Sequence, residues 1–295
     1  MQNNSEIKIL VLGSNGNLGS QIVRELQSKY VGKFFSWTRA DCDLTNLTEL
    51  ETKISKLHPT MIINTVAYND VDACEHNIEE QKKAIILNVK LVECLAYLCQ
   101  ELKIKLIHFS TNYVFSGTQS SYTEFDKPSP INFYGLTKLL GEESIIERIE
   151  NGLNGCIIRV SNLFGPCGTS KNSKPSFFES INKAAKKKDS LTIVADERCC
   201  FTYTRDVART LIASLEDRNF KGIYHFVNSG PLSWYEAATI YFKLINAPVF
   251  LQPIDGASYG REAKRPSSAI LIPTRSKPMR NFQLALKEYI EESSC

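Results

Sequence analysis

The chain of 295 residues lacks both a strong charge of one sign and any long hydrophobic run. Its 35 Lys+Arg and 32 Asp+Glu leave a formal net charge of +3, which is too small to favour a nucleic-acid or membrane-surface partner. No apolar stretch approaches the roughly 18 residues of a membrane-spanning helix, and the polar start does not resemble a signal peptide. We therefore expect no nucleic-acid partner, no membrane partner and a cytoplasmic location.

The nine cysteines include no CxxC pair, and no histidine stands at ligand spacing from them. Their odd number argues against a disulfide framework, and their spacing argues against a zinc site. We expect reduced, mostly buried thiols and no metal. The adjacent Cys199 and Cys200 are candidates for redox chemistry, but their only cationic neighbour in sequence is Arg198.

What the sequence does contain is a repeated alternation of strand and helix patterns. Ile7 to Leu12 is a continuous apolar run that ends in glycine, as in a strand buried on both faces, and Asn17 to Leu26 follows with apolar residues at helical spacing. The alternation continues to about residue 160 and includes one long predicted helix over Glu79 to Leu102. It predicts an α/β fold with a doubly wound parallel sheet.

Gly13, Gly16 and Gly19 lie between the first predicted strand and helix with GxxGxxG spacing. The first glycine permits a tight turn, the second lets the backbone approach a pyrophosphate, and the third allows close helix packing. An ordinary glycine-rich turn is the alternative, but the flanking pattern favours a dinucleotide site. We predict an NAD(P)-binding Rossmann domain over 1–160, and over 161–295 mainly a smaller substrate lobe with some segments returning to the first domain.

The end of the second predicted strand carries Thr38 and Arg39 where NAD-specific sites usually place an acid. A basic residue there binds a 2′-phosphate, which favours NADP(H). In the competing interpretation Arg39 is only solvent-exposed, and Asp41 or Asp43 holds the ribose of NAD(H). Both interpretations stay open on the sequence.

Tyr134 and Lys138 are four residues apart near the start of a predicted helix, so they share one face of it. A nearby Lys⁺ lowers the pKa of a tyrosine from about 10 and makes it a proton donor and acceptor near neutrality. Ser110 and Thr111 close the fourth predicted strand, at the sheet edge that lines the ligand crevice.

These residues resemble the extended short-chain dehydrogenase/reductases and, more closely, the dTDP-4-dehydrorhamnose reductase family. The resemblance covers most of the chain and is also carried by Ile63–Tyr68, Val71–Glu75, Leu87–Val89, Ser110–Gly117, Leu191–Asp196 and Ala263–Pro266. It implies an NAD(P)H-dependent sugar-nucleotide oxidoreductase of deoxysugar biosynthesis. Such an enzyme reduces the C4 keto group of a nucleotide-linked 4-keto-6-deoxy sugar, and the resemblance allows a homodimer.

The resemblance also implies site residues. Thr111, Tyr134 and Lys138 would form the catalytic trio. The cofactor would contact Gly13, Asn15, Gly16, Asn17, Leu18 and Gly19 through its pyrophosphate, Asp43 and Leu44 through its adenine, and Thr65, Val66 and Ala67 through its middle. The sugar would contact Thr111, Asn112, Val114, Phe115 and Asn162.

Two residues depart from the family pattern. Asn112 replaces an aspartate and Asn162 replaces a tryptophan that stacks on the sugar, so the sequence leaves open a different hexose or nucleotide. A dehydratase is disfavoured because Asn112 and Tyr113 stand where dehydratases of this superfamily carry an Asp-Glu pair. An epimerase remains an alternative because it needs the same Tyr and Lys. A non-catalytic NADP-binding regulatory subunit is another, because a fold alone does not establish turnover.

Overall fold

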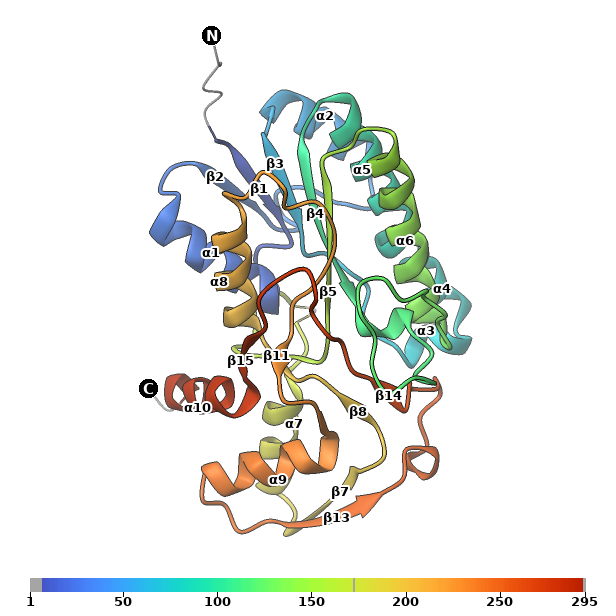
Figure 1. Ribbon diagram of the computed structural model, residues 1–295, viewed down its shortest axis with the longest axis vertical. Helices are drawn as coiled ribbons and strands as arrows, with labels where there is room; N and C mark the ends of the chain where they lie inside the picture. The colour runs from blue at the N-terminus through green and yellow to red at the C-terminus, as the bar shows by residue number, and fades with distance from the viewer. Residues whose placement is uncertain (1–6, 172, 294–295) are drawn as a thin grey trace.

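The computed structural model describes residues 7–171 and 173–293, which form a larger and a smaller lobe (Figure 1). The larger lobe holds a six-stranded sheet in the order β10-β5-β4-β3-β1-β2, with every neighbouring pair parallel. The strands are β1 Ile9–Leu12, β2 Phe34–Trp37, β3 Met61–Asn64, β4 Lys105–Thr111, β5 Gly155–Val160 and β10 Gly222–His225. The predicted α/β fold with a parallel sheet is confirmed.

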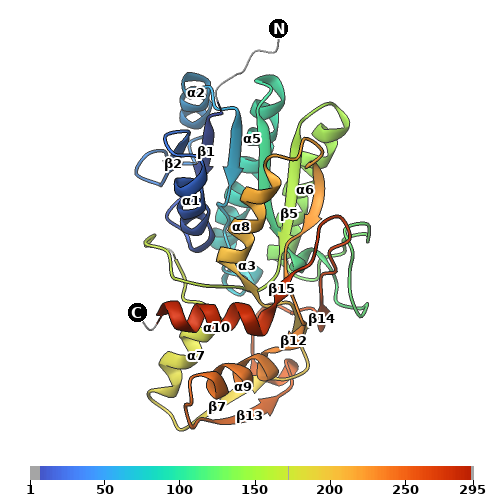
Figure 2. The ribbon, with the colours of Figure 1, turned by 60° about the vertical axis from the view of Figure 1, so that its left-hand side comes forward.

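Helices cover both faces of this sheet (Figure 2). On one face, Ile9 and Val11 pack with α1 (Asn17–Lys29) and α8 (Thr204–Ser214). On the other face, Leu10 and Leu12 pack with helices α2 (Leu47–Leu57), α5 (Leu91–Glu101) and α6 (Phe133–Glu150). Burial on both sides is the physical reason why the first strand is apolar at every position.

The strand order reverses at β1, which has β2 on one side and β3 on the other. In open α/β sheets the point of reversal leaves a crevice at the carboxyl ends of the strands, where ligands bind. The glycine-rich turn after β1 and the segment 65–67 after β3 both lie at this point. The topology therefore places two of the predicted cofactor segments side by side.

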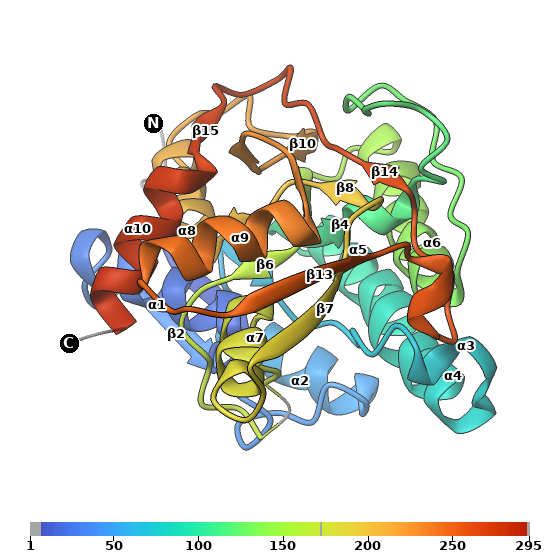
Figure 3. The same ribbon diagram turned by 90° about the horizontal axis from the view of Figure 1, so that it is seen from below.

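The second half of the chain contributes to both lobes. Strand β10 pairs with β5, and α8 packs against α1, so both belong to the larger lobe. The smaller lobe has its own aromatic core between α7 (Phe177–Ala185), α9 (Trp234–Leu244) and α10 (Phe282–Ser293). Strands β7 (Ser190–Val194) and β13 (Phe250–Ile254) lie across its lower side (Figure 3).

The long helix expected over residues 79–102 is divided into α4 (Ile78–Ile85), a π-helix over Ile86–Lys90 and α5. Short elements complete the described structure: α3 Ala73–His76, a 3₁₀ turn over Asn112–Val114, a 3₁₀ turn over Ala257–Tyr259, β6 Leu163–Phe164, β8 Arg198–Cys199, β9 Thr202–Tyr203, β11 Asn228–Ser229, β12 Leu232–Ser233, β14 Ser268–Ala269 and β15 Met279–Asn281. Most of these strands are only two residues long, which is too short for a periodic sequence signal.

None of the helices within 7–171 and 173–293 has the length and apolar composition that a membrane crossing requires. The eight cysteines in this part of the chain are free thiols, and six of them are buried. Burial raises the pKa of Cys200 to about 11 and that of Cys199 well above its usual value. The adjacent pair is therefore protonated at neutral pH and has little of the thiolate character that redox chemistry needs.

Candidate active site at the carboxyl edge of the sheet

The first and third glycines of the turn after β1 are required by geometry. Gly13 has a φ of 75°, and a Cβ there would lie 2.8 Å from both Thr65 Oγ1 and Val66 Cγ2. A Cβ on Gly19 would lie 2.1 Å from the carbonyl oxygen of Gly13. The first glycine therefore makes the turn and the third lets α1 pack closely against it, as the sequence predicted.

Gly16 is less crowded than these two glycines. A Cβ there would meet only the Gly13 oxygen, at 3.3 Å. Gly16 is also the residue that caps α1, without a side-chain hydrogen bond, and the first turn of α1 contains no acid. A helix N-terminus that has neither a side-chain cap nor a nearby acid fits an anionic group such as a pyrophosphate.

Thr65 holds the glycine-rich turn in place. Its hydroxyl donates to the carbonyl oxygen of Leu12 at 2.8 Å, and its backbone N–H donates to the same oxygen at 3.1 Å. Val66 and Ala67 continue from it along the crevice. The segment 65–67, which the sequence predicts to contact the middle of the cofactor, thus also holds the glycine-rich turn in place.

The loop after β6 lies directly on the glycine-rich turn, which the sequence did not predict. Gly168 donates its N–H to Asn17 Oδ1 at 2.9 Å, and Asn17 Nδ2 donates to the Lys174 carbonyl oxygen at 2.9 Å. A Cβ on Gly168 would lie 2.4 Å from the Asn15 oxygen. Asn15 and Asn17 are therefore joined to the second half of the chain. A lone glycine in a Pro- and Ser-containing loop gave no signal of this contact.

The acids after β2 form local turns. Asp41 Oδ2 accepts from the N–H and the hydroxyl of Thr38, both at 2.8 Å, and Asp43 Oδ1 accepts from the N–H and hydroxyl of Thr45 at 3.0 and 2.8 Å. These hydrogen bonds lower the pKa of both carboxyls. Arg39, which precedes both acids, is exposed, and its charge is a further cause that lowers the pKa of Asp43. Both interpretations of this strand end are compatible with this geometry.

Thr111, Tyr134 and Lys138 are brought together at the carboxyl end of β4. Asn132 begins α6 by accepting the Gly135 N–H at 2.8 Å, which sets Tyr134 and Lys138 on successive turns of the helix. Burial raises the pKa of Tyr134 above its usual value, and the nearby Thr111 hydroxyl opposes this rise. The phenol is therefore protonated at neutral pH.

The Lys138 ammonium does not lie where the sequence led us to expect. The side chain is buried, and its Nζ is 2.7 Å from the Phe109 carbonyl oxygen and 3.1 Å from His108 Nε2. Burial lowers the pKa of Lys138 to about 8, with the charge of Glu142 acting in the opposite direction. The expectation that Lys138 lowers the pKa of Tyr134 is wrong for this arrangement, because burial of the phenol dominates.

Asn112 connects the two lobes. Its Nδ2 donates to the Ala269 carbonyl oxygen of β14 at 3.2 Å, and its Oδ1 accepts from the Thr111 hydroxyl at 3.3 Å. An aspartate carboxylate, the residue of the family pattern, has no hydrogen to donate to Ala269. The amide is therefore matched to this lobe contact.

Asn162 has a φ of 34°, in the left-handed region, and its side chain donates to the Cys199 sulfur. Asparagine tolerates this backbone region better than a bulky side chain does. The asparagine is therefore suited to the backbone at this position, and its amide is turned towards Cys199 of the smaller lobe.

Val114 and Phe115 do not contribute side chains to a ligand space, which corrects the sequence prediction. Both side chains are fully buried, and the Phe115 ring stacks on Tyr122 with 4.2 Å between centroids. The Arg159 guanidinium lies 5.0 Å from the same ring. The 3₁₀ turn over 112–114 directs these residues into the core.

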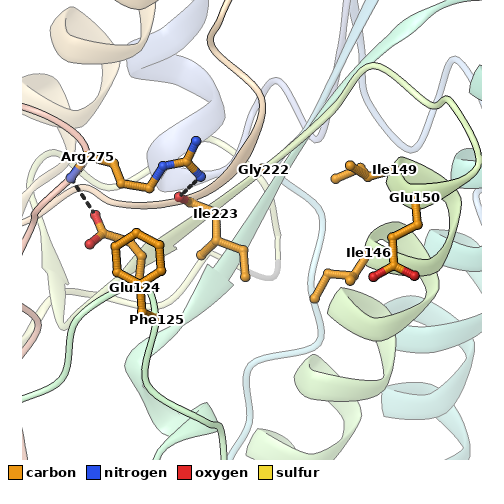
Figure 4. A pocket seen from close by; sticks show the side chains of 8 residues that line it. All are labelled: Glu124, Phe125, Ile146, Ile149, Glu150, Gly222, Ile223 and Arg275. Atoms are coloured by element: carbon orange, nitrogen blue, oxygen red, sulfur yellow. Dashed lines mark hydrogen bonds between the residues drawn. The ribbon is translucent and has the colours of Figure 1, made fainter.

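A separate pocket opens at the other end of the sheet. Figure 4 shows it between the last turns of α6 (Ile146, Ile149), the start of β10 (Gly222, Ile223) and Arg275. The Arg275 Nη1 donates to the Ile223 carbonyl oxygen at 2.9 Å. The pocket lies at the amino end of β10, away from Thr111 and the glycine-rich turn, so it is not part of the candidate site.

The chain is similar to curated proteins and to solved structures over nearly its whole length. The chain is 30% identical to the spore coat polysaccharide biosynthesis protein SpsK of Bacillus subtilis, covering 97% of this chain and 98% of that protein. It is 30% identical to a dTDP-4-dehydrorhamnose reductase of Burkholderia thailandensis, over 90% of each chain. The crystal structure of dTDP-4-dehydrorhamnose reductase from Bacillus anthracis in complex with NADP has a TM-score of 0.88 at 28% identity, covering 97% of this chain and 99% of that one.

The family model described as the RmlD substrate binding domain matches residues 7–295, which is nearly the whole chain. The match includes both lobes, so the likeness is not limited to the dinucleotide-binding turn. The chain belongs to the dTDP-4-dehydrorhamnose reductase family, as its motifs led us to expect.

Proposed function

We propose that the protein uses NAD(P)H to reduce the C4 keto group of a nucleotide-linked 4-keto-6-deoxy sugar, with Tyr134 as the proton donor. The observation that carries this proposal is the convergence of three side chains at the carboxyl edge of the sheet: Thr111 ends β4, Tyr134 lies in the first turn of α6, and Lys138 follows one turn later with its Nζ 2.7 Å from the Phe109 carbonyl oxygen of β4. The protein is an oxidoreductase of its family, and this trio is the acid and base machinery that the reaction needs.

The residues of the glycine-rich turn fit a bound dinucleotide. The glycine-rich turn and the uncapped start of α1 would hold its pyrophosphate, and Thr65 to Ala67 would lie along its middle. When bound, NAD(P)H supplies the hydride for C4. The chain's own residues supply the proton: the raised pKa of Tyr134 keeps the phenol protonated, and Thr111 orients it towards the keto oxygen.

NADP(H) is the preferred cofactor in this proposal. The exposed Arg39 offers a charge-assisted contact for a 2′-phosphate, whereas Asp41 and Asp43 already accept two hydrogen bonds each from their own turns. The NADP in the Bacillus anthracis relative supports the same preference.

The test is a spectrophotometric panel of dTDP-, UDP- and GDP-linked 4-keto-6-deoxyhexoses with NADPH and NADH. We expect oxidation of the cofactor with at least one of these sugars. Absence of turnover with every sugar, despite measurable dinucleotide binding, would overturn the proposal in favour of a non-catalytic subunit. Retention of the cofactor as tightly bound NAD, together with interconversion of sugar epimers, would point to an epimerase.

The role of Tyr134 has its own test. Tyr134→Phe removes only a hydroxyl, so it should lower kcat by roughly 10²- to 10⁴-fold, the usual contribution of a positioned proton donor. Cofactor affinity should stay within a few-fold of the wild-type value. Tyr97→Phe, at an exposed position of α5, is the matched control. A Tyr134→Phe variant that keeps nearly full kcat would refute the assignment.

A further inference from the structure

A continuous chain of hydrogen bonds runs from β3 through β4 to Lys138. Asn64 Oδ1 accepts the Val66 N–H at 3.0 Å, Asn64 Nδ2 lies 3.1 Å from His108 Nδ1, and His108 Nε2 lies 3.1 Å from Lys138 Nζ. Asn64 and His108 are fully buried and stand at paired positions of neighbouring strands. The chain therefore ends on the amine of the proposed active site.

The Val66 N–H fixes the direction of this chain. Because a backbone N–H can only donate, it holds the oxygen of the Asn64 amide on its own side and turns Nδ2 towards His108. Nδ1 must then accept, so a neutral His108 ring carries its proton on Nε2, facing Lys138. A neutral Lys138 amine can accept that proton in a hydrogen bond, whereas an ammonium cannot.

We propose that Asn64 and His108 are positioning residues for Lys138: Asn64 fixes which ring nitrogen of His108 carries the proton, and His108 thereby controls whether Lys138 is an amine or an ammonium. Protonation of Lys138 requires the proton of the His108 ring to move from Nε2 to Nδ1. There the ring N–H faces the Nδ2 hydrogens of Asn64, and two donors cannot form a hydrogen bond with each other. The amine is thus favoured by geometry as well as by burial. The consequence for catalysis rests on the proposed function, in which Lys138 acts beside Tyr134.

The other charged groups near Lys138 do not replace this control. Glu142, one turn along α6, favours the ammonium, but it is buried in an ion pair with Arg159, at 2.6 Å between Glu142 Oε2 and Arg159 Nη2. Burial lowers the pKa of Lys138. Burial is also the larger cause that lowers the pKa of His108, and the charge of Lys138 is the smaller one. His108 therefore stays neutral as Lys138 gains its proton, and only the position of the ring proton changes.

The direct test is ¹⁵N NMR of the four histidine rings of the whole protein, with His108 assigned by the signals lost in His108→Gln. We expect the His108 proton on Nε2 at high pH and on Nδ1 at low pH, between about pH 6 and about pH 10, the range in which a shifted lysine titrates. The ring should stay neutral throughout, and Lys138→Met should abolish the change. A proton on Nδ1 at high pH, or ring shifts that do not respond to pH, would overturn the proposal.

The second test is the pH dependence of kcat/KM. If the reaction needs the Lys138 ammonium, activity falls as pH rises through the pKa of Lys138, near 8. In His108→Gln the side-chain oxygen can accept from the ammonium and favour it, so the descending limb should move up by about one pH unit. A uniform loss of kcat/KM without this shift would mean a merely structural role and would overturn the proposal. His76→Gln, at an exposed position, is the control.

The two tests separate the failure of this inference from that of the proposed function. A protein without turnover would refute the proposed reduction, yet the NMR titration would still decide whether Asn64 and His108 control the Lys138 amine. An active protein whose His108 signals do not respond to Lys138 would refute the inference alone.

Discussion

On the cofactor side of the candidate site the glycine-rich turn gets its shape from local backbone geometry, to which Asn17 adds hydrogen bonds with the loop after β6, whereas the sugar side depends on side-chain hydrogen bonds between distant segments. Gly13, Gly16 and Gly19 build the first within a few residues of one another. The second depends on contacts such as Asn112 Nδ2 to Ala269 at 3.2 Å and Asn132 Nδ2 to the Lys264 carbonyl oxygen at 2.9 Å. The two sides should therefore respond differently to substitution.

The difference has a physical origin. A backbone turn that approaches a ligand has no room for a Cβ, so its residues are restricted to glycine or to small capping residues. A side-chain contact between lobes requires only a suitable donor and acceptor at the right distance, so its residues can change when both partners change. Variation of the sugar pocket is thus compatible with an unchanged cofactor turn.

The largest effect is expected at Gly19. Gly19→Ala places a Cβ 2.1 Å from the Gly13 oxygen, so the turn must shift. We expect dinucleotide affinity to fall by about 100-fold or more, because misplacing a site by about 1 Å has costs of this order, and stability to fall by about 1–3 kcal/mol. Cofactor titration and chemical denaturation measure the two quantities.

Gly16→Ala is the matched comparison, because its Cβ would meet the Gly13 oxygen at 3.3 Å, a tight contact but a much milder one than at Gly19. It should cost less stability than Gly19→Ala and still weaken dinucleotide binding. Equal behaviour of the two variants in both measurements would contradict the distinct roles given to these glycines.

A smaller effect is expected at Arg39. Arg39→Ala should weaken NADPH binding by about 1–3 kcal/mol, roughly 5- to 150-fold, and leave NADH binding nearly unchanged, because only the 2′-phosphate is lost as a partner. Arg24→Ala, which removes an equal charge from an exposed position of α1, is the control. Equal losses for the two dinucleotides would refute the preference for NADP(H).

Asn112→Asp tests the sugar side. The variant loses the donor to Ala269 and buries a carboxyl beside a carbonyl oxygen, which should cost about 1–3 kcal/mol of stability near neutrality. Burial raises the folded-state pKa of the introduced carboxyl, so the loss should be small at low pH and grow as pH rises above about 4. Denaturation at several pH values measures this, with the exposed Asn219→Asp as control. A loss of stability that does not depend on pH would contradict this explanation. A weaker affinity for the cofactor would show that the sugar side and the cofactor side are not independent.

The smallest effect is expected at Asn162, where the sugar side also depends on the backbone. Asn162→Ala and Asn162→Gly both lose the contact with Cys199, but only alanine is strained at a φ of 34°. The alanine variant should therefore be less stable than the glycine variant by about 1 kcal/mol. Chemical denaturation of the two variants gives this difference directly, and a more stable alanine variant would contradict it.

The cofactor side was predictable because its signals are local. The glycine spacing, the strand before it and the helix after it stand within twenty residues or so of sequence, and the structure places them as expected. The pair Tyr134 and Lys138 was predictable for the same reason, since the helical repeat alone sets both residues on one face.

Contacts that depend on strand register or on long loops were not predictable. Asn64 and His108 are polar residues in two strands with mostly apolar neighbours, and only the pairing of β3 with β4 shows that they lie side by side. Gly168 meets the glycine-rich turn across about 150 residues of sequence, as its hydrogen bond to Asn17 shows. The side chains of Val114 and Phe115 were expected in the sugar pocket for a similar reason. The short 3₁₀ turn over Asn112–Val114 follows β4 directly and turns both side chains into the core, and such a turn has no sequence signal.

The loop on the glycine-rich turn also offers a chemical handle. Cys167 precedes Gly168 and is the one exposed cysteine among the residues 7–171 and 173–293. Burial raises the pKa of its thiol, so a maleimide dye should couple more slowly than to a free thiol but more readily than to the buried cysteines. In a Cys295→Ser background, a fluorophore at this position would sit beside Asn17 and report dinucleotide entry as a change in emission, without any need for a substrate.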